Sequence, residues 1–248
     1  GPDGRVREEA LTGKPVPELF GDLAITHVVE LTLKVGAGSN AYAETINIGL
    51  YNKCPELVKE MVDLCGRGGL ITSKNLLLGA PVRIGDGFGA LTYITDERLE
   101  FGVASQKVAY AKKIRKAKAP DEFVPQPRPS GERLELVRNE PSARMHDAAG
   151  LVTVPKEGIG YGTFLSANDD EAYSNAFQIT AAASPDMDRA GRKVVGQILD
   201  AKSMDALARL AGSPLRKALP TQKGGSPLIK VVVDDSVVTA KSDLEAKE

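Results

Sequence analysis

Residues 176–210 read AFQITAAASPDMDRAGRKVVGQILDAKSMDALARL, and this stretch decides the fold. It holds two short apolar runs, Ala176–Ala181 and Val194–Leu199, with a polar turn between them. Short apolar runs bounded by turn residues are typical of strands. Ser203 is predicted to cap a short helix, which Gly212 ends. Two strands in succession with no helix between them favour an antiparallel sheet over an alternating βαβ fold.

Further strands and a second helix are predicted outside this stretch. Ile25–Lys34 and Ala43–Tyr51 alternate in the manner of a hairpin. Pro55 suits the first position of a helix that ends before Gly66. The other predicted strands flank 95–97 and run over Gly150–Val154 and Leu228–Val233. About eight strands and two separated helices predict a mainly β fold: a closed eight-stranded antiparallel barrel capped by two helices.

The chain divides by composition into an extension, one domain and a tail. Residues 1–24 form an N-terminal extension that starts with Gly1-Pro2, interpreted as the remnant of a tag. Residues 25–240 form the domain, with a long insertion at about 106–144, and residues 241–248 form a charged tail. The insertion contains a basic run and several prolines, which favour extended geometry. It either covers part of the barrel or remains a solvated loop.

Composition excludes several classes of function. The 248 residues include 32 Lys and Arg against 33 Asp and Glu, so no overall charge attracts nucleic acid. No apolar run approaches the length of a membrane span. Cys54 and Cys65 fall at the two ends of one predicted helix, too far apart for a disulfide. With two histidines and no clustered cysteines, we expect neither a metal site nor a cofactor.

Residues that carry chemistry are few, and each has a plain structural interpretation. The glycine-rich pieces do not join a strand to a helix, as a phosphate loop requires, and are interpreted as turns. His27 falls within a strand. His146 lies beside Asp147, and we expect a hydrogen bond within a turn there. The basic run at 112–116 is interpreted as a solvated face, with an acidic partner as the alternative.

The order of these pieces from Ile25 to about Asp235 resembles a cyclophilin-type peptidyl-prolyl isomerase. The motifs that carry the resemblance are Asn47–Tyr51 followed by Val62–Gly66, Met145–Val152, Phe177–Thr180, Ser184–Asp188, Lys193–Ile198 and Met204-Asp205. The resemblance implies a cyclophilin-like barrel. The shortened Val-Val-Gly element is similar to that of divergent plastid members, many of them in the thylakoid lumen. This implies a plastid location, and without it a soluble intracellular protein.

The resemblance also implies a proline groove whose residues have changed. The family grips proline in an apolar pocket, and one arginine lowers an isomerisation barrier near ~20 kcal/mol. Alignment on Gly85–Phe88 places that arginine at Leu76. The remaining groove positions fall on Pro81, Val82, Ile84, Pro155, Lys156, Ala176, Gln178, Asp186, Met187 and Arg192. Arg83 and Arg192 are the candidate substitutes for the missing arginine.

These changes imply a binding protein rather than an efficient enzyme. Loss of one oriented, charged donor removes several kcal/mol of transition-state stabilisation, but peptide binding does not require it. We therefore expect a peptide- or protein-binding chaperone or assembly factor with weak or no isomerase activity, whose partners are proteins or proline-containing segments. The alternative is an active isomerase that uses a non-standard arginine. A third interpretation is a structural module whose groove is filled by its own insertion.

Overall fold

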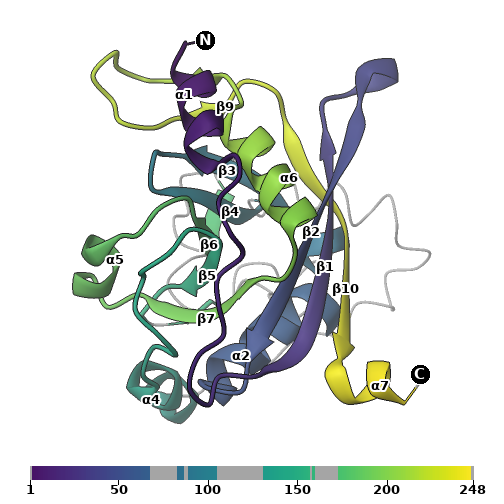
Figure 1. The fold of residues 1–248 in the computed structure, drawn as a ribbon, viewed down its shortest axis with the longest axis vertical. Helices are drawn as coiled ribbons and strands as arrows, with labels where there is room; N and C mark the ends of the chain where they lie inside the picture. Colours follow the sequence, from purple (N-terminus) through teal and green to yellow (C-terminus); the bar gives the residue numbers. More distant parts are fainter. Residues whose placement is uncertain are drawn as a thin grey trace.

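The computed structural model describes residues 2–67, 83–86, 89–104, 131–156, 158–159 and 173–246. Eight of its strands close into an antiparallel barrel in the order β1-β10-β3-β4-β6-β5-β7-β2. Their bounds are β1 (Ile25–Val35), β2 (Tyr42–Tyr51), β3 (Gly89–Ile94), β4 (Arg98–Ala104), β5 (Leu151–Val154), β6 (Tyr173–Thr180), β7 (Lys193–Ile198) and β10 (Val231–Ala240). The predicted fold class is confirmed (Figure 1).

Short helices surround the barrel. They are α1 (Pro2–Leu11), α2 (Pro55–Val62), α4 (Gly131–Asn139), α5 (Pro185–Arg189), α6 (Ala201–Ala211) and α7 (Lys241–Glu245). The two predicted helices correspond to α2 and α6. Asp200, rather than Ser203, caps α6: its carboxylate accepts the Ser203 N–H at 2.8 Å. In the described part of the chain, no helix has the length and apolar character needed to cross a bilayer.

The core fills the barrel with side chains that alternate along the strands. Phe101 of β4 and Phe177 of β6 are register partners, and their rings stack with centroids 5.0 Å apart. Both are fully buried, so Phe177 is a core residue. On β5, however, Leu151 and its three successors are all buried, because this strand is covered on both faces.

The N-terminal extension supplies part of that second cover. Leu23 packs with Tyr51, Leu151 and Val194 in a small cluster outside the main core. Gln197 of β7 donates a hydrogen bond to the carbonyl of Pro17 at 2.6 Å. Further along, α1 packs against α6, and the extension runs down the outside of the barrel (Figure 1).

The end of the insertion is built into the fold by two helix caps. The Glu140 carboxylate accepts the backbone N–H groups of Glu56 and Leu57, at 2.7 and 2.8 Å, and so caps the start of α2. The Lys193 ammonium donates to the carbonyls of Val137 and Arg138 at the end of α4. These contacts define the α2–α4 junction. The prolines at 120–129 and the basic run at 112–116 lie outside the described residues, so the idea that the insertion covers the groove stays a prediction.

Two boundaries differ from those expected. The last barrel strand begins at Val231 rather than Leu228, because Leu228 and Ile229 form an exposed bend before it. It continues to Ala240, and the charged tail then begins with α7, which packs against β1 and β10. Between α6 and β10 the chain makes a small two-stranded sheet from β8 (Leu215–Arg216) and β9 (Ser226–Pro227).

Candidate functional site

The predicted groove residues fall into three groups in the structure. Leu76, Pro81 and Val82 lie outside the described residues. Ile84, with Arg83 before it, lies against β10. The others lie on β6 and around the ends of β5 and β7; they are Pro155, Lys156, Ala176, Gln178, Asp186, Met187 and Arg192.

Arg83 is held by the last barrel strand. Its Nη1 donates to the carbonyl of Ser236 at 2.9 Å, and its Nη2 lies 3.6 Å from Asp235 Oδ1. Ile84 is fully buried in a short 3-10 turn (Ile84–Asp86), and its side chain closely approaches Gly89 of β3. In the barrel order, β3 and β4 separate this position from β6. Arg83 and Arg192 therefore belong to different parts of the molecule.

Ala176 does not face the outside of the barrel. The register between β4 and β6 shifts between Phe101 and Gly102, so Ala176 has no direct partner on β4. It is 1% exposed and packs in the main core beside Phe177. The bulge breaks the alternation of β6 at Ala176, so this predicted groove residue lies in the core instead.

Gln178 lies in a group of polar side chains on three adjacent strands. Its register partners are Glu100 on β4 and Thr153 on β5. Its Nε2 donates to Glu100 Oε1 at 3.0 Å, and the same oxygen accepts Arg98 Nε at 2.8 Å. Arg192, just before β7, donates from Nη2 to the carbonyl of Thr153 at 3.1 Å. We call Arg98, Glu100, Thr153, Gln178 and Arg192 the polar cluster.

Two buried atoms of the polar cluster have no hydrogen-bond partner within the described residues: Gln178 Oε1, an acceptor, and Arg192 Nε, a donor. Gln178 is 4% exposed. Burial lowers the pKa of Arg192 to about 10; Glu100 acts against this shift, and Arg98 adds to it. Buried polar groups without partners are rare in folded proteins, so such a pair points to an unfilled role. The cluster reaches solvent through the side chains of Arg98 and Glu100, which are 31% and 16% exposed.

A series of hydrogen bonds that ends at Thr153 supports the polar cluster. His146 Nδ1 lies 2.6 Å from Asp188 Oδ1, and its Nε2 lies 2.8 Å from Thr153 Oγ1. A carboxylate only accepts, so Nδ1 carries the proton and Nε2 accepts from the threonine hydroxyl. Burial lowers the pKa of His146, although Asp188 acts in the opposite direction. The histidine is therefore neutral near pH 7.

This arrangement replaces the turn hydrogen bond expected between His146 and Asp147. Asp147 instead pairs with Arg144 at 2.9 Å. The order of carboxylate, imidazole and hydroxyl resembles a nucleophilic triad, but a nucleophile must reach its substrate. Thr153 has no exposed surface and His146 only 1%. This series of hydrogen bonds therefore holds β5 and the loop before it in place rather than performing acyl transfer.

Three of the motifs that carry the cyclophilin resemblance meet at this place. Met145–Val152 and Ser184–Asp188 are joined by the His146–Asp188 contact and by the Ser184 N–H, which donates to the His146 carbonyl. The hydroxyl of Thr180, at the end of Phe177–Thr180, donates to the carbonyl of Ala148 and accepts the Leu151 N–H. Residues up to 42 positions apart in the sequence thus form one hydrogen-bonded unit.

The remaining predicted groove residues lie around this hydrogen-bonded unit and take less part in it. Met187 is 5% exposed, whereas Asp186 lies on the surface, where it pairs with Arg189. The Lys156 side chain runs over Gly191, next to Arg192. Sequence reasoning missed Arg98, Glu100 and Thr153. Their one available signal was that each lies on a predicted strand next to an apolar core position.

Other chemistry-bearing side chains do not extend the site. Cys54 and Cys65 are free and buried, and burial raises their thiol pKa values to about 11 and 12. They are therefore thiols, not reactive thiolates, at neutral pH. Over the described residues, no three His, Cys, Asp or Glu side chains form a group that could hold a metal.

No protein-family model matches the chain, and no curated protein matches its sequence. The resemblance to cyclophilins therefore rests on the motifs quoted above and on the closed antiparallel barrel in which they lie.

Proposed function

We propose that this chain is a cyclophilin-type barrel that binds extended protein segments at the polar cluster and has little or no prolyl isomerase activity. In the cell it would act as a chaperone or assembly factor. The observation that carries the proposal is the unmatched pair, Gln178 Oε1 and Arg192 Nε, in one buried cluster that opens to solvent. A peptide group offers one N–H donor and one carbonyl acceptor, which is the complement of this pair.

Weak catalysis follows from what surrounds the two arginines. Prolyl isomerisation by this family needs an apolar pocket for the ring and an N–H group free to reach the prolyl amide. Arg83 is tied to the carbonyl of Ser236 and to Asp235. Arg192 donates one N–H to Thr153, and the charges of Glu100 and Arg98 act on its pKa. Charged side chains beside the site favour the binding of a polar peptide backbone over that of an apolar proline ring.

One observation favours the alternative of an active isomerase. The Nε–H of Arg192 is unused by the described residues, so a guanidinium donor is present near the groove. A working enzyme would direct this donor at the prolyl nitrogen. The two proposals differ in whether proline-containing segments are preferred and in whether their cis and trans forms exchange faster in the presence of the protein.

An immobilised array of 15-residue peptides, with and without proline, tests the binding proposal. We expect the protein to retain a set of peptides that is not enriched in proline. The Arg192→Met variant should lose them, because it removes the donor while keeping the apolar stem. Arg189→Met is the matched control, since Arg189 lies three residues away with a side chain that is 73% exposed.

Two results would contradict the proposal. One is that the protein retains no peptide. The other is equal retention by the Arg192→Met variant, which would mean that a buried water, not a ligand, satisfies the two unmatched atoms. The plastid location, proposed from the resemblance alone, is tested separately by detecting the protein in fractionated cells.

A further inference from the structure

One end of the barrel carries cations and exposed apolar side chains together. Between Ala206 and Val233 the sequence has five Lys and Arg but no Asp or Glu. Four of these cations lie in the segment 212–230, which contains β8 and β9. Lys34 joins them from the tip of the β1–β2 hairpin. We call this surface the basic end; its cations are Lys34, Arg216, Lys217, Lys223 and Lys230.

Large exposed apolar side chains occur on the same two segments, the hairpin and 212–230. They are Tyr42, Leu219, Leu228 and Ile229, which are 53%, 64%, 52% and 47% exposed. Single exposed apolar residues are ordinary, but several at one end of a protein mark an interaction site. Lys34, Arg216, Lys223 and Lys230 make no ion pair with the described residues, so their charge is available to a partner.

The two parts of the basic end are held side by side by backbone contacts. The Gly36 N–H donates to the Lys230 carbonyl at 2.9 Å, and Lys34 is the register partner of Val232. On the other side, Gly225 exchanges two hydrogen bonds with Ile94 of β3, at 2.9 and 3.1 Å. Gln222 also donates to the hydroxyl of Tyr93 at 2.7 Å. The segment is therefore fixed in place before any partner arrives.

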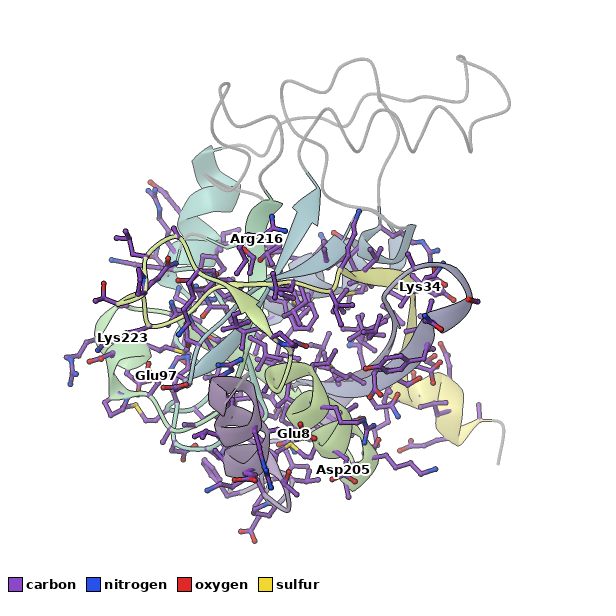
Figure 2. The ribbon with its side chains drawn as sticks, turned by 90° about the horizontal axis from the view of Figure 1, so that it is seen from above. Glu8, Lys34, Glu97, Asp205, Arg216 and Lys223 are labelled. Carbon is purple, nitrogen blue, oxygen red and sulfur yellow. The ribbon has the colours of Figure 1, made fainter. Side chains whose placement is uncertain are left out.

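Acidic side chains also lie at this end of the barrel. Figure 2 shows Lys34, Arg216 and Lys223 along the hairpin and the segment 212–230, with Glu8 and Asp205 on α1 and α6. The Glu8 carboxylate lies against Gly212, where the segment begins. Glu97 is the labelled acid beside Lys223. Glu44, on strand β2 of the hairpin, is already paired with Arg209 at 2.8 Å. Within the segment 212–230 itself every charged side chain is a cation, on a protein whose formal net charge is −1.

We propose that the basic end is a peripheral docking surface for an anionic lipid bilayer. Cations held near such a surface are attracted to its headgroups, and adjacent aliphatic and tyrosine side chains enter the interface. A lipid surface fits better than an acidic peptide. The apolar residues come from separate loops, without the strand or helix spacing that reads a peptide. This surface is independent of the polar cluster, so either proposal can fail alone.

Co-sedimentation with phosphatidylcholine vesicles, with and without about 30% phosphatidylglycerol, tests this surface. We expect binding to the anionic vesicles only, weakened by high salt because the charges are exposed. Each cation near an anionic membrane contributes about fivefold in affinity, so Lys223→Glu with Lys230→Glu should reduce binding by more than about 25-fold. Leu228→Ser with Ile229→Ser should reduce it several-fold.

Lys202→Glu with Lys241→Glu is the matched control, with the same change in net charge. Lys202 and Lys241 are exposed in α6 and α7, away from the basic end. The control should bind as the unchanged protein does. The proposal is overturned if anionic vesicles are not bound, or if the control loses as much binding as the Lys223/Lys230 variant. A further contrary result is vesicle binding that does not depend on Leu228 and Ile229, together with equally strong binding of soluble polyglutamate to the protein. That result would assign the surface to an acidic protein instead.

Discussion

The α2–α4 junction and the polar cluster both bury charged side chains, but the protein satisfies them differently. In the junction, Glu140 accepts two backbone N–H groups at the start of α2, and Lys193 donates to two carbonyls at the end of α4. In the polar cluster, Arg192 donates to Thr153 but keeps a buried Nε that no described residue satisfies. Arg144 also has a buried Nε without a partner among the described residues, but its Nη atoms are bonded to Glu18, Tyr51 and Asp147. Arg192, which lies in a cluster that reaches solvent, is the better candidate for a ligand.

The largest effect is expected where the cluster depends on the core. Gln178 reaches Glu100 only if its neighbour Phe177 points into the barrel and stacks on Phe101. Phe177→Ala should cost about 3–5 kcal/mol in the free energy of unfolding, the range for a buried Phe. Chemical denaturation measures it. A cost below about 1 kcal/mol would mean that Phe177 does not point into the barrel. The register of β6 would then differ from that described, and Gln178 would not belong to the polar cluster.

Glu60 differs from the other charged side chains of the α2–α4 junction, because its titration makes the stability of the folded protein depend on pH. Burial raises its pKa from 4.5 to about 7; Glu140 and Asp63 add to the shift, and the hydrogen bond from the Ile159 N–H opposes it. The folded protein therefore holds a proton that the unfolded chain loses near pH 4.5. Stability from this group is complete below about pH 4.5 and is lost as the pH rises through about 7.

The Glu60→Gln variant isolates this effect, because the amide keeps an acceptor for the Ile159 N–H but does not titrate. We expect it to be more stable than the unchanged protein above pH 7, by at most about 3 kcal/mol. Its advantage should shrink as the pH falls toward 4.5. Denaturation curves at several pH values measure the difference. A pH-independent difference would mean that Glu60 does not titrate in this range.

A pair of substitutions compares the matched and unmatched charges directly. Glu140→Ala removes the cap of α2 and leaves two N–H groups without partners, which should cost about 1–3 kcal/mol. Arg192→Met removes an incompletely paired buried charge and keeps apolar volume, so unfolding should change by less than about 1 kcal/mol or become more difficult. Thermal denaturation of both variants decides this. Equal losses would mean that Arg192 is a structural residue like Glu140.

The sequence predicted the regular parts of this molecule well. Alternation and turn residues located the β1–β2 hairpin, β6, β7 and the helices α2 and α6, because these signals are local. The place of the N-terminal extension is not local: Leu23 and Pro17 contact β5 and β7, more than 120 residues away. Helix α4 and its caps were missed for the same reason.

The candidate site was predicted only in part. Gln178 and Arg192 were named from the resemblance, but Glu100 and Thr153 meet Gln178 only through strand pairing. The bulge that turns Ala176 into the core depends on how Phe101 and Gly102 pair across the barrel, which no local pattern records. The His146–Asp188 contact joins two recognised motifs, yet Asp147, adjacent to His146, offered a simpler partner.

The most direct test of the central claim is two-dimensional NMR exchange spectroscopy on a proline peptide that the array shows to be bound. It reports binding and cis–trans exchange in one sample. The account predicts that the peptide signals broaden or shift on binding. Exchange between the isomers should still take the uncatalysed time of tens to hundreds of seconds. Fast exchange in the presence of a catalytic amount of protein, abolished by Arg192→Met, would contradict it and identify a working isomerase.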